Sequence, residues 1–243
     1  MKQFTYLLIN LVVFLPVFLL SFDQKVGFWK KRRAAFAAIG AVAIPFLVWD
    51  VWFTAAKYWG FNTSYLGGLS IYNLPLEEIL FFLTVPYASL FVFQVVQDYF
   101  PNEKIEKIGR PFIVVVGLVI FVGLLFGKGR MYPTLTGGLL FPSLLFAFWK
   151  NPRWLGHFAL AWILLIIPFL LINGILTGSL IEKEVVWYHA DHIIGFRIFT
   201  IPIEDLFYGM LLIFWNCFLF EEFKKWKPAK QVDHYKQSYK THG

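Results

Sequence analysis

The sequence contains few charged residues and almost no cysteine. Charged residues make up 15% of its 243 residues, whereas soluble globular domains carry roughly 25%. The single cysteine, Cys217, excludes an internal disulfide and a cysteine-based metal cluster. The chain is therefore neither an ordinary soluble domain nor a small domain stabilised by disulfides.

Motifs of nucleotide and cofactor chemistry are missing as well. The sequence has no glycine-rich phosphate loop and no dinucleotide fingerprint, which argues against a nucleotide or flavin bound by a Rossmann unit. It has no aspartate-rich run to hold magnesium for chemistry on prenyl diphosphates. The last apolar run has no lysine for a retinal Schiff base. We therefore assign no cofactor from these motifs, and the need for a reduced cofactor for activation stays open from the sequence.

One pair of histidines is spaced as metal ligands can be. His189 and His192 stand three residues apart in VVWYHADHIIGFR, which also contains Asp191 and Arg197. Two histidines at this spacing on a helix can bind a metal ion, but the sequence specifies no third ligand. We expect a loop that caps a site, and no metal site.

Long apolar runs dominate the chain, and 58% of its residues are hydrophobic. Crossing a hydrocarbon core takes roughly 17–25 helical residues. Seven runs are predicted to do so: 4–22, 34–54, 76–96, 111–127, 135–149, 154–176 and 203–220. The first is too long for a signal peptide and lacks a cleavage site, so we expect it to be retained. The fold class is an all-α polytopic membrane protein.

The net charge of +7 reflects membrane topology and not nucleic-acid binding. When alternate loops are assigned to alternate faces, one face receives most of the 22 lysines and arginines, including those of the tail at 223–243. The positive-inside rule then places the N-terminus outside and the C-terminus in the cytoplasm. We expect a multi-pass protein of the cell (inner) membrane, with a basic tail near anionic lipids.

The chain contains an internal duplication. NLPLEEILFF returns as TIPIEDLFYG, IPFLVWD returns as IPFLLIN, and Pro16 matches Pro142. The spacing between the copies varies from 126 to 123 and 127 residues, as small loop insertions would cause. We predict a first three-helix repeat (1–100), a linking helix (101–133), a second three-helix repeat (134–222) and the tail. One helix between the halves makes the repeats parallel.

This plan brings acids to one layer of the membrane. Its predicted members are Asp50, Glu77, Glu78, Asn173, Glu204 and Asp205. An acid inside a transmembrane helix costs about 2.5–3.5 kcal/mol and usually faces a cavity or a partner. Acids in a first helical turn can also simply suit the helix dipole, but two copies at one depth favour function. Two carboxyls in a poorly hydrated pocket cannot easily both ionise, so one can serve as a Brønsted acid.

Aromatic residues surround these acids in the sequence. We predict that they bind substrate: Trp49, Trp52, Phe53, Phe81, Phe82, Phe207 and Tyr208. Aromatic faces can stabilise a carbocation, although aromatics also pack helices and mark membrane interfaces.

The duplicated motif resembles that of the membrane lycopene β-cyclases of the heterodimeric type, with both three-helix halves fused into one chain. Their P-x-E-[ED] motif is matched by PLEE at 75–78 and PIED at 202–205. The resemblance implies protonation of a linear ψ end group of lycopene, ring closure through a carbocation and loss of a proton, which gives a β-ionone ring.

The same resemblance implies roles for individual residues. Glu78 and Glu204 are the leading pair, with Glu77 and Asp205 as neighbours that set their hydrogen bonds or charge. Asp50 would relay a proton or hold the pair. Asn173, where the second repeat departs from the first, would orient without titrating.

Two other functions remain open from the sequence. A carotenoid hydratase would add water to the same cation, and the choice between water and base depends on desolvation. A small 3+1+3 transporter would need a wet path across the membrane. The expected partners are a lipid-soluble carotene and membrane lipids, with self-association or contact with other carotenoid enzymes open.

Overall fold

The computed structural model describes residues 2–226, which form a bundle of long helices. In this range the helices are α1 Thr5–Leu20, α2 Arg32–Ala55, α3 Leu76–Tyr99, α4 Glu103–Phe126, α5 Met131–Lys150, α6 Leu155–Leu176 and α7 Ile203–Lys225. All seven are long and apolar enough to cross a membrane. The predicted class, an all-α polytopic membrane protein, is confirmed. The predicted basic tail lies almost wholly outside the described residues.

Two helices begin well before the apolar runs that predicted them. The fourth run, 111–127, lies in a helix that begins at Glu103, because the Asn102 side chain accepts a hydrogen bond from the Lys104 N–H and caps it. The fifth run, 135–149, lies in α5, which begins four residues earlier. Hydropathy finds the part of a helix that suits lipid, whereas capping decides where the helix begins.

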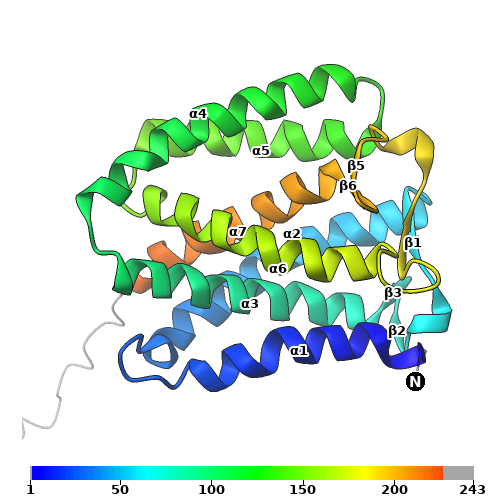
Figure 1. Ribbon diagram of the computed structural model, residues 1–243, viewed down its shortest axis with the longest axis horizontal. Helices are drawn as coiled ribbons and strands as arrows, with labels where there is room; N and C mark the ends of the chain where they lie inside the picture. The colour runs from blue at the N-terminus through cyan, green and yellow to red at the C-terminus, as the bar shows by residue number, and fades with distance from the viewer. Residues whose placement is uncertain (1, 227–243) are drawn as a thin grey trace, which may run out of the picture.

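Short elements connect the helices. The strands are β1 Trp59–Phe61, β2 Ser70–Ile71, β3 Leu74–Pro75, β4 Val186–Tyr188, β5 Arg197–Ile198 and β6 Ile201–Pro202. Four 3-10 turns are described as well: η1 Lys2–Phe4, η2 Phe28–Lys31, η3 Thr63–Tyr65 and η4 Ala190–His192. The strands lie together at one end of the bundle, which we call the hairpin end (Figure 1).

The duplication is visible in these strands. The β2–β3 hairpin pairs Ser70 with Pro75, and the β5–β6 hairpin pairs Arg197 with Pro202, 127 residues later. Each hairpin leads directly into the third helix of its repeat. Both third helices therefore begin at the same end of the molecule, as parallel repeats require. The domain boundaries at 100, 133 and 222 stay a prediction.

The two repeats are interlocked in space. The second helix of each repeat packs along the third helix of the other, so α2 lies against α7 and α6 lies against α3. A further pair of strands joins the halves, since β1 pairs antiparallel with β4 and Trp59 lies opposite Tyr188. The linking helix α4 lies outside this arrangement, against α5 and α6 (Figure 1). A site at the centre therefore draws on both repeats.

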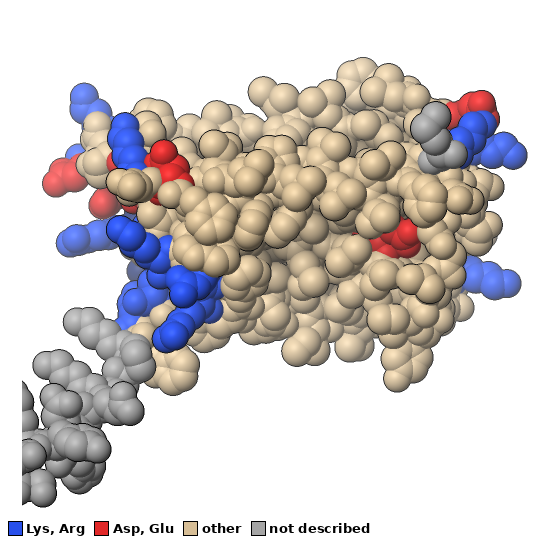
Figure 2. Space-filling model, turned by 90° about the horizontal axis from the view of Figure 1, so that it is seen from below, with Lys and Arg blue, Asp and Glu red and all other residues tan. Residues whose placement is uncertain are grey.

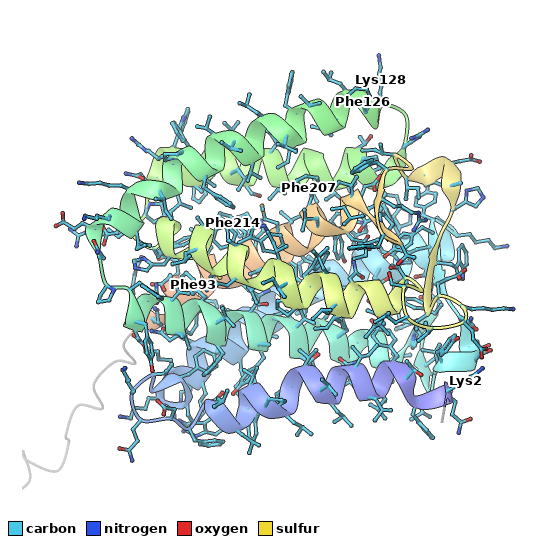
Figure 3. All side chains as sticks on the ribbon, in the orientation of Figure 1. Lys2, Phe93, Phe126, Lys128, Phe207 and Phe214 are labelled. Atoms are coloured by element: carbon cyan, nitrogen blue, oxygen red, sulfur yellow. The ribbon has the colours of Figure 1, made fainter. Side chains whose placement is uncertain are left out.

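The surface fits a membrane. Lys and Arg side chains gather at the two ends of the molecule, and the broad belt between them is uncharged on this face apart from one small group of acidic atoms (Figure 2). Phe126, near the end of α4, is exposed, whereas Phe93 and Phe214 are buried between helices (Figure 3).

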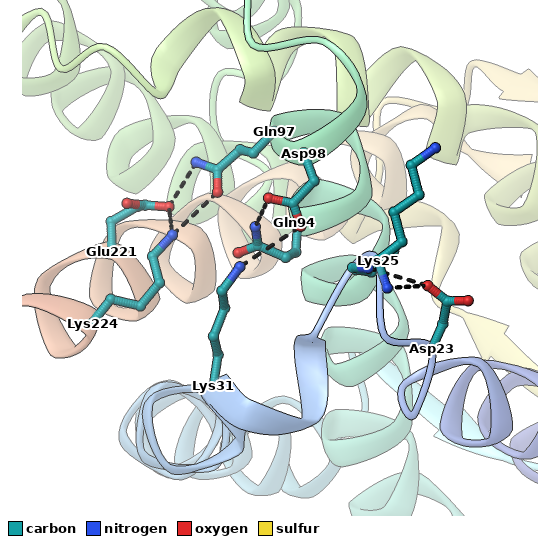
Figure 4. A network of polar contacts seen from close by, with 9 residues as sticks. Asp23, Lys25, Lys31, Gln94, Gln97, Asp98, Glu221 and Lys224 are labelled. Atoms are coloured by element: carbon teal, nitrogen blue, oxygen red, sulfur yellow. Dashed lines mark hydrogen bonds and ion pairs between the residues drawn. The ribbon is translucent and has the colours of Figure 1, made fainter.

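At the end opposite the hairpins, polar side chains connect η2, α3 and α7. The Lys31 Nζ lies 3.7 Å from the Asp98 carboxylate of α3. On α7, Lys224 pairs with Glu221 at 2.5 Å and donates to the Gln97 side chain at 3.1 Å. The C-terminal end of α3 is thus fixed to α7 and to η2, the turn that leads into α2 (Figure 4).

Glycine allows the close approach of α4 and α6. A Cβ on Gly156 would collide with the backbone carbonyl of Ile105, and a Cβ on Gly109 would lie 2.8 Å from the Gly156 nitrogen. We expect Gly156→Ala to destabilise the protein by about 1–3 kcal/mol, because backbone atoms would have to move apart. Thermal unfolding in detergent measures this. Gly123→Ala on α4, where no atom lies within 4 Å, is the matched control, and equal melting of the two variants would contradict the prediction.

Candidate active site

A cavity of about 530 Å³ lies between the repeats, and four of the residues predicted to take part in catalysis line it. These are the acids Asp50, Glu78 and Asp205, together with Asn173. Asp50 and Asp205 are buried, whereas Glu78 is partly exposed. Figure 2 shows acidic atoms within the otherwise uncharged belt, toward one end of the molecule. The structure therefore brings together three of the five predicted acids on one cavity.

Asp205 is held by donors on three different elements. Its Oδ1 accepts a hydrogen bond from the Tyr132 hydroxyl at 2.8 Å. Its Oδ2 accepts from Asn173 Nδ2 at 2.9 Å and from the Tyr188 hydroxyl at 2.8 Å. Burial, together with the nearby Asp205 charge, raises the pKa of Tyr188 well above its usual range, so this hydroxyl keeps its proton. Three donors suit a carboxylate, which only accepts hydrogen bonds.

Glu78 occupies the same position in the first repeat but has fewer donors. Its Oε2 accepts a hydrogen bond from the Tyr6 hydroxyl at 2.5 Å, and Tyr6 stands 126 residues before Tyr132. The positions that correspond to Asn173 and Tyr188 are occupied by Asp50 and Phe61, which lack the amide N–H of Asn173 and the hydroxyl of Tyr188. Within the described chain the Glu78 carboxyl thus accepts one side-chain hydrogen bond, against three at Asp205.

Asp50 occupies the position in the first repeat that corresponds to Asn173 in the second, and only one of its two carboxylate oxygens accepts hydrogen bonds. Its Oδ1 accepts from Trp59 Nε1 at 2.6 Å and from the Thr54 hydroxyl at 3.3 Å. Its Oδ2 is buried and has no hydrogen-bond partner among the described residues. An unpaired buried oxygen is costly, and a proton carried by Asp50 or by a neighbouring carboxyl would relieve that cost. Asp50 is therefore suited to exchange a proton.

The first acid of each motif points away from the cavity and accepts a hydrogen bond from the backbone of a loop. Glu77 accepts a hydrogen bond from the Gly67 N–H at 2.7 Å, and Glu204 accepts one from the Ile194 N–H. The two loop residues are themselves 127 positions apart. Neighbouring residues on a helix point about 100° apart, so only the second acid of each pair can face the cavity. Both Glu77 and Glu204 lie outside the cavity lining.

We expect Glu77→Ala and Glu204→Ala each to lower stability by about 1–3 kcal/mol, since each leaves a loop N–H without its acceptor. Thermal unfolding of the detergent-purified protein measures the change. Glu182→Ala is the control because its ion pair with Lys2 is exposed and contributes little. Unchanged melting combined with lost activity would instead indicate that Glu77 or Glu204 acts in the chemistry.

The predicted aromatic residues divide into two groups. Phe81, Phe82 and Tyr208 line the cavity. Outside the lining, Trp49 packs on the Tyr208 ring at 5.0 Å, and Trp52 is 48% exposed. Phe53 packs on Trp59 at 4.7 Å, and Phe207 is partly buried outside the lining.

Sequence reasoning missed four cavity residues whose side chains donate hydrogen bonds to these acids. They are Tyr6, Trp59, Tyr132 and Tyr188. The spacing of Tyr6 and Tyr132, 126 residues, is the same as that of Pro16 and Pro142. The duplication could therefore have identified these two tyrosines. Trp59 and Tyr188 are brought together only by the β1–β4 pairing, which the sequence pattern did not predict.

The histidine loop lies next to this site. His192 stacks on Tyr58 with ring centroids 4.1 Å apart, and His189 lies 3.8 Å from Asp191. The preceding strand β4 contributes Val186 to the cavity lining. Within residues 2–226, no group of three or more His, Cys, Asp or Glu side chains could hold a metal ion.

Comparison with known proteins adds one match. A family model described as Lycopene cyclase matches residues 3–96 and 129–223. Each matched segment contains one three-helix repeat, and the unmatched segment between them contains α4. No curated protein and no solved structure matches the chain.

Proposed function

The chain belongs to the lycopene cyclase family, and we propose that it converts the linear ψ end groups of lycopene into β-ionone rings. The observation that carries this proposal is the cavity itself. It places the carboxyl groups of Asp50, Glu78 and Asp205 among apolar and aromatic side chains inside a membrane-spanning bundle. A hydrocarbon offers no polar group to recognise, so acids in such a cavity are suited to proton transfer.

We assign the proton donor to Glu78. Its protonated carboxyl adds a proton to the terminal double bond of the end group, which leaves a tertiary carbocation. The neighbouring double bond attacks this cation, and the new carbon–carbon bond closes the ring. A general acid positioned in this way contributes about 10²–10⁴-fold to the rate.

Asp205 is assigned the role of counter-ion and base. Its three donors keep the carboxylate in place while the cation forms, and the aromatic ring of Tyr208 adds its negative face. Loss of a ring proton to Asp205 then creates the new double bond. The proton returns to Glu78, with Asp50 as relay, so the reaction is redox-neutral. In this assignment Asp205 replaces Glu204 as the partner of Glu78.

Expression in a host that accumulates lycopene tests the proposed function. The expected pigment has the mass of lycopene but a changed chromatographic retention and spectrum. A mass gain of one water would identify a hydratase, and unaltered lycopene would reject chemistry on this substrate and favour transport. The polar groups of the cavity gather near the hairpin end, which supports chemistry over a wet path across the membrane.

We also propose the orientation in the membrane. The lysines and arginines of the η2 turn, the α4 start and the α7 end lie opposite the hairpin end. By the positive-inside rule this face is cytoplasmic. The hairpin end, and with it the site, then lies at the outer half of the inner membrane.

A further inference from the structure

The cavity does not follow the symmetry of the repeats. Near the hairpins it is lined by both halves, including Tyr6 with Tyr132 and Glu78 with Asp205. Farther into the bundle it continues along α1, α3, α6 and α7, where Val13, Ala88, Leu165 and Leu212 are among the lining residues. The corresponding branch along α5 and α2 is missing, because these two helices contribute only Tyr132 and Asp50, both near the hairpins, to the lining. One of two symmetry-related branches is open, and the other is closed.

Three exchanges of size account for this difference. Ala88 on the open branch corresponds to Trp215, 127 residues later. Ile172 corresponds to Trp49, and Gly209 corresponds to Phe82. In the first two pairs only the smaller residue lines the cavity. In the third pair both residues line it, and the smaller one, Gly209, faces α6.

The two tryptophans, Trp215 and Trp49, do not line the cavity and occupy the closed branch. The Trp215 indole donates a hydrogen bond to the Ser143 hydroxyl at 3.1 Å, which fixes it between α7 and α5. The Trp49 ring packs on Phe46 and Tyr208, and Phe82 packs on Phe46 at 6.3 Å. Well-packed interiors leave few voids, so in the closed branch these two indoles fill the space whose counterpart in the open branch, beside Ala88 and Ile172, stays empty.

The open branch reaches the lipid-facing surface. Val12 on α1 and Leu171 on α6 both line the cavity, yet they are 71% and 60% exposed. Packing of α1 in the bundle is mainly against α3, and α6 packs against α3 and α4. The space between α1 and α6 therefore opens sideways, into the region that the hydrocarbon core surrounds.

We propose that the polyene chain of the substrate enters from the bilayer between α1 and α6 and lies in this groove, and that Ala88 and Gly209 provide the room for it. This inference rests on the proposed function. A hydrocarbon chain with no polar atoms is the ligand that fits, because the lining is apolar and the opening faces lipid. With a single open branch, the two ends of one lycopene are processed in separate binding events.

The test replaces two small residues of the groove by the larger residues that stand at the corresponding positions of the other repeat. In Gly209→Phe and Ala88→Trp, we expect cyclised pigment to fall by about tenfold or more, because the larger side chains occupy the room of the polyene chain; a tenfold loss corresponds to about 1.4 kcal/mol of binding. Gly209→Ala gives a graded variant, since its Cβ would meet Phe169 at 3.4 Å and Trp162 at 3.7 Å in ordinary contact. The matched control is Gly123→Phe, at a helical glycine with no atom within 4 Å.

A second measurement separates binding from chemistry. Each change is combined with Glu78→Gln, and the lycopene retained per purified protein is measured by its absorbance. We expect retention with Glu78→Gln alone and its loss when Gly209→Phe is added. Cyclisation at the control level by folded Gly209→Phe and Ala88→Trp would overturn the groove but leave the function standing. If the unmodified chain forms no ring, the proposed function fails, and the retention measurement alone decides the groove.

Discussion

Glu78→Gln is expected to reduce ring formation by about 10²–10⁴-fold, which is the usual contribution of a positioned general acid. The amide has the size of the carboxyl, and its oxygen can still accept the hydrogen bond of the Tyr6 hydroxyl. It cannot deliver a proton to a hydrocarbon. The fold should therefore persist while the chemistry is lost. Pigment extraction from a lycopene-producing host, normalised to the amount of protein in the membrane, measures the effect.

The control for this prediction is Glu182→Gln. Glu182 lies at the hairpin end but is paired with Lys2 at the surface, with its side chain 74% exposed, and it does not line the cavity. This variant should cyclise like the unmodified chain. Normal product from Glu78→Gln would remove Glu78 as the acid and move the assignment to Asp50, whose Oδ2 is buried without a partner in the described chain.

The overall plan of the molecule could be predicted because it depends on local patterns. An apolar run long enough to cross the membrane is helical wherever it lies, since lipid leaves the backbone no other hydrogen-bond partner. The duplicated PLEE and PIED motifs fixed the register of the repeats. The predicted depth of Asp50 and Asn173 agrees with their places on the cavity.

The choice between adjacent acids could not be predicted. Glu204 and Asp205 both stand in the first turn of α7, and the sequence alone gives no reason to prefer one as the cavity residue. The direction is set by the hairpin that packs beside the helix, whose Ile194 N–H engages Glu204. Such a contact joins residues ten apart across a turn, and no helical or strand period reveals it.

The size differences between the repeats were also out of reach. Trp49 and Ile172 are both apolar, so they look equivalent in a hydropathy pattern. Their effect depends on which neighbour each meets, and α2 and α6 meet the third helix of the opposite repeat. Duplication thus explains why two similar halves exist, while substitutions at a few matched positions explain why the halves differ. The same reasoning applies to the acids. The position that Asp50 occupies in the first repeat is occupied in the second by Asn173, which lies beside Asp205.

Asp205→Asn is expected to reduce ring formation by about 10²–10³-fold, comparable to the loss of one preorganised electrostatic contact to a transition-state charge. The substitution removes the negative charge that faces the carbocation. It also turns an acceptor oxygen into an NH₂ group within reach of donors on Tyr132, Asn173 and Tyr188. We therefore expect lower thermal stability as well as lost activity. Pigment analysis and thermal unfolding measure the two effects separately.

The double variant Asp205→Asn with Asn173→Asp separates charge from position. Asn173 Nδ2 and Asp205 Oδ2 are 2.9 Å apart, so exchanging the two residues keeps one donor, one acceptor and one negative charge in the pair. Stability should recover, because the hydrogen bond re-forms in the opposite direction. Activity should recover only in part, since the charge now projects from α6 and has lost the two tyrosine donors that hold Asp205. Full activity of folded Asp205→Asn would refute the counter-ion role, whereas full activity of the exchanged pair would show that the site needs a charge in this region but not at residue 205.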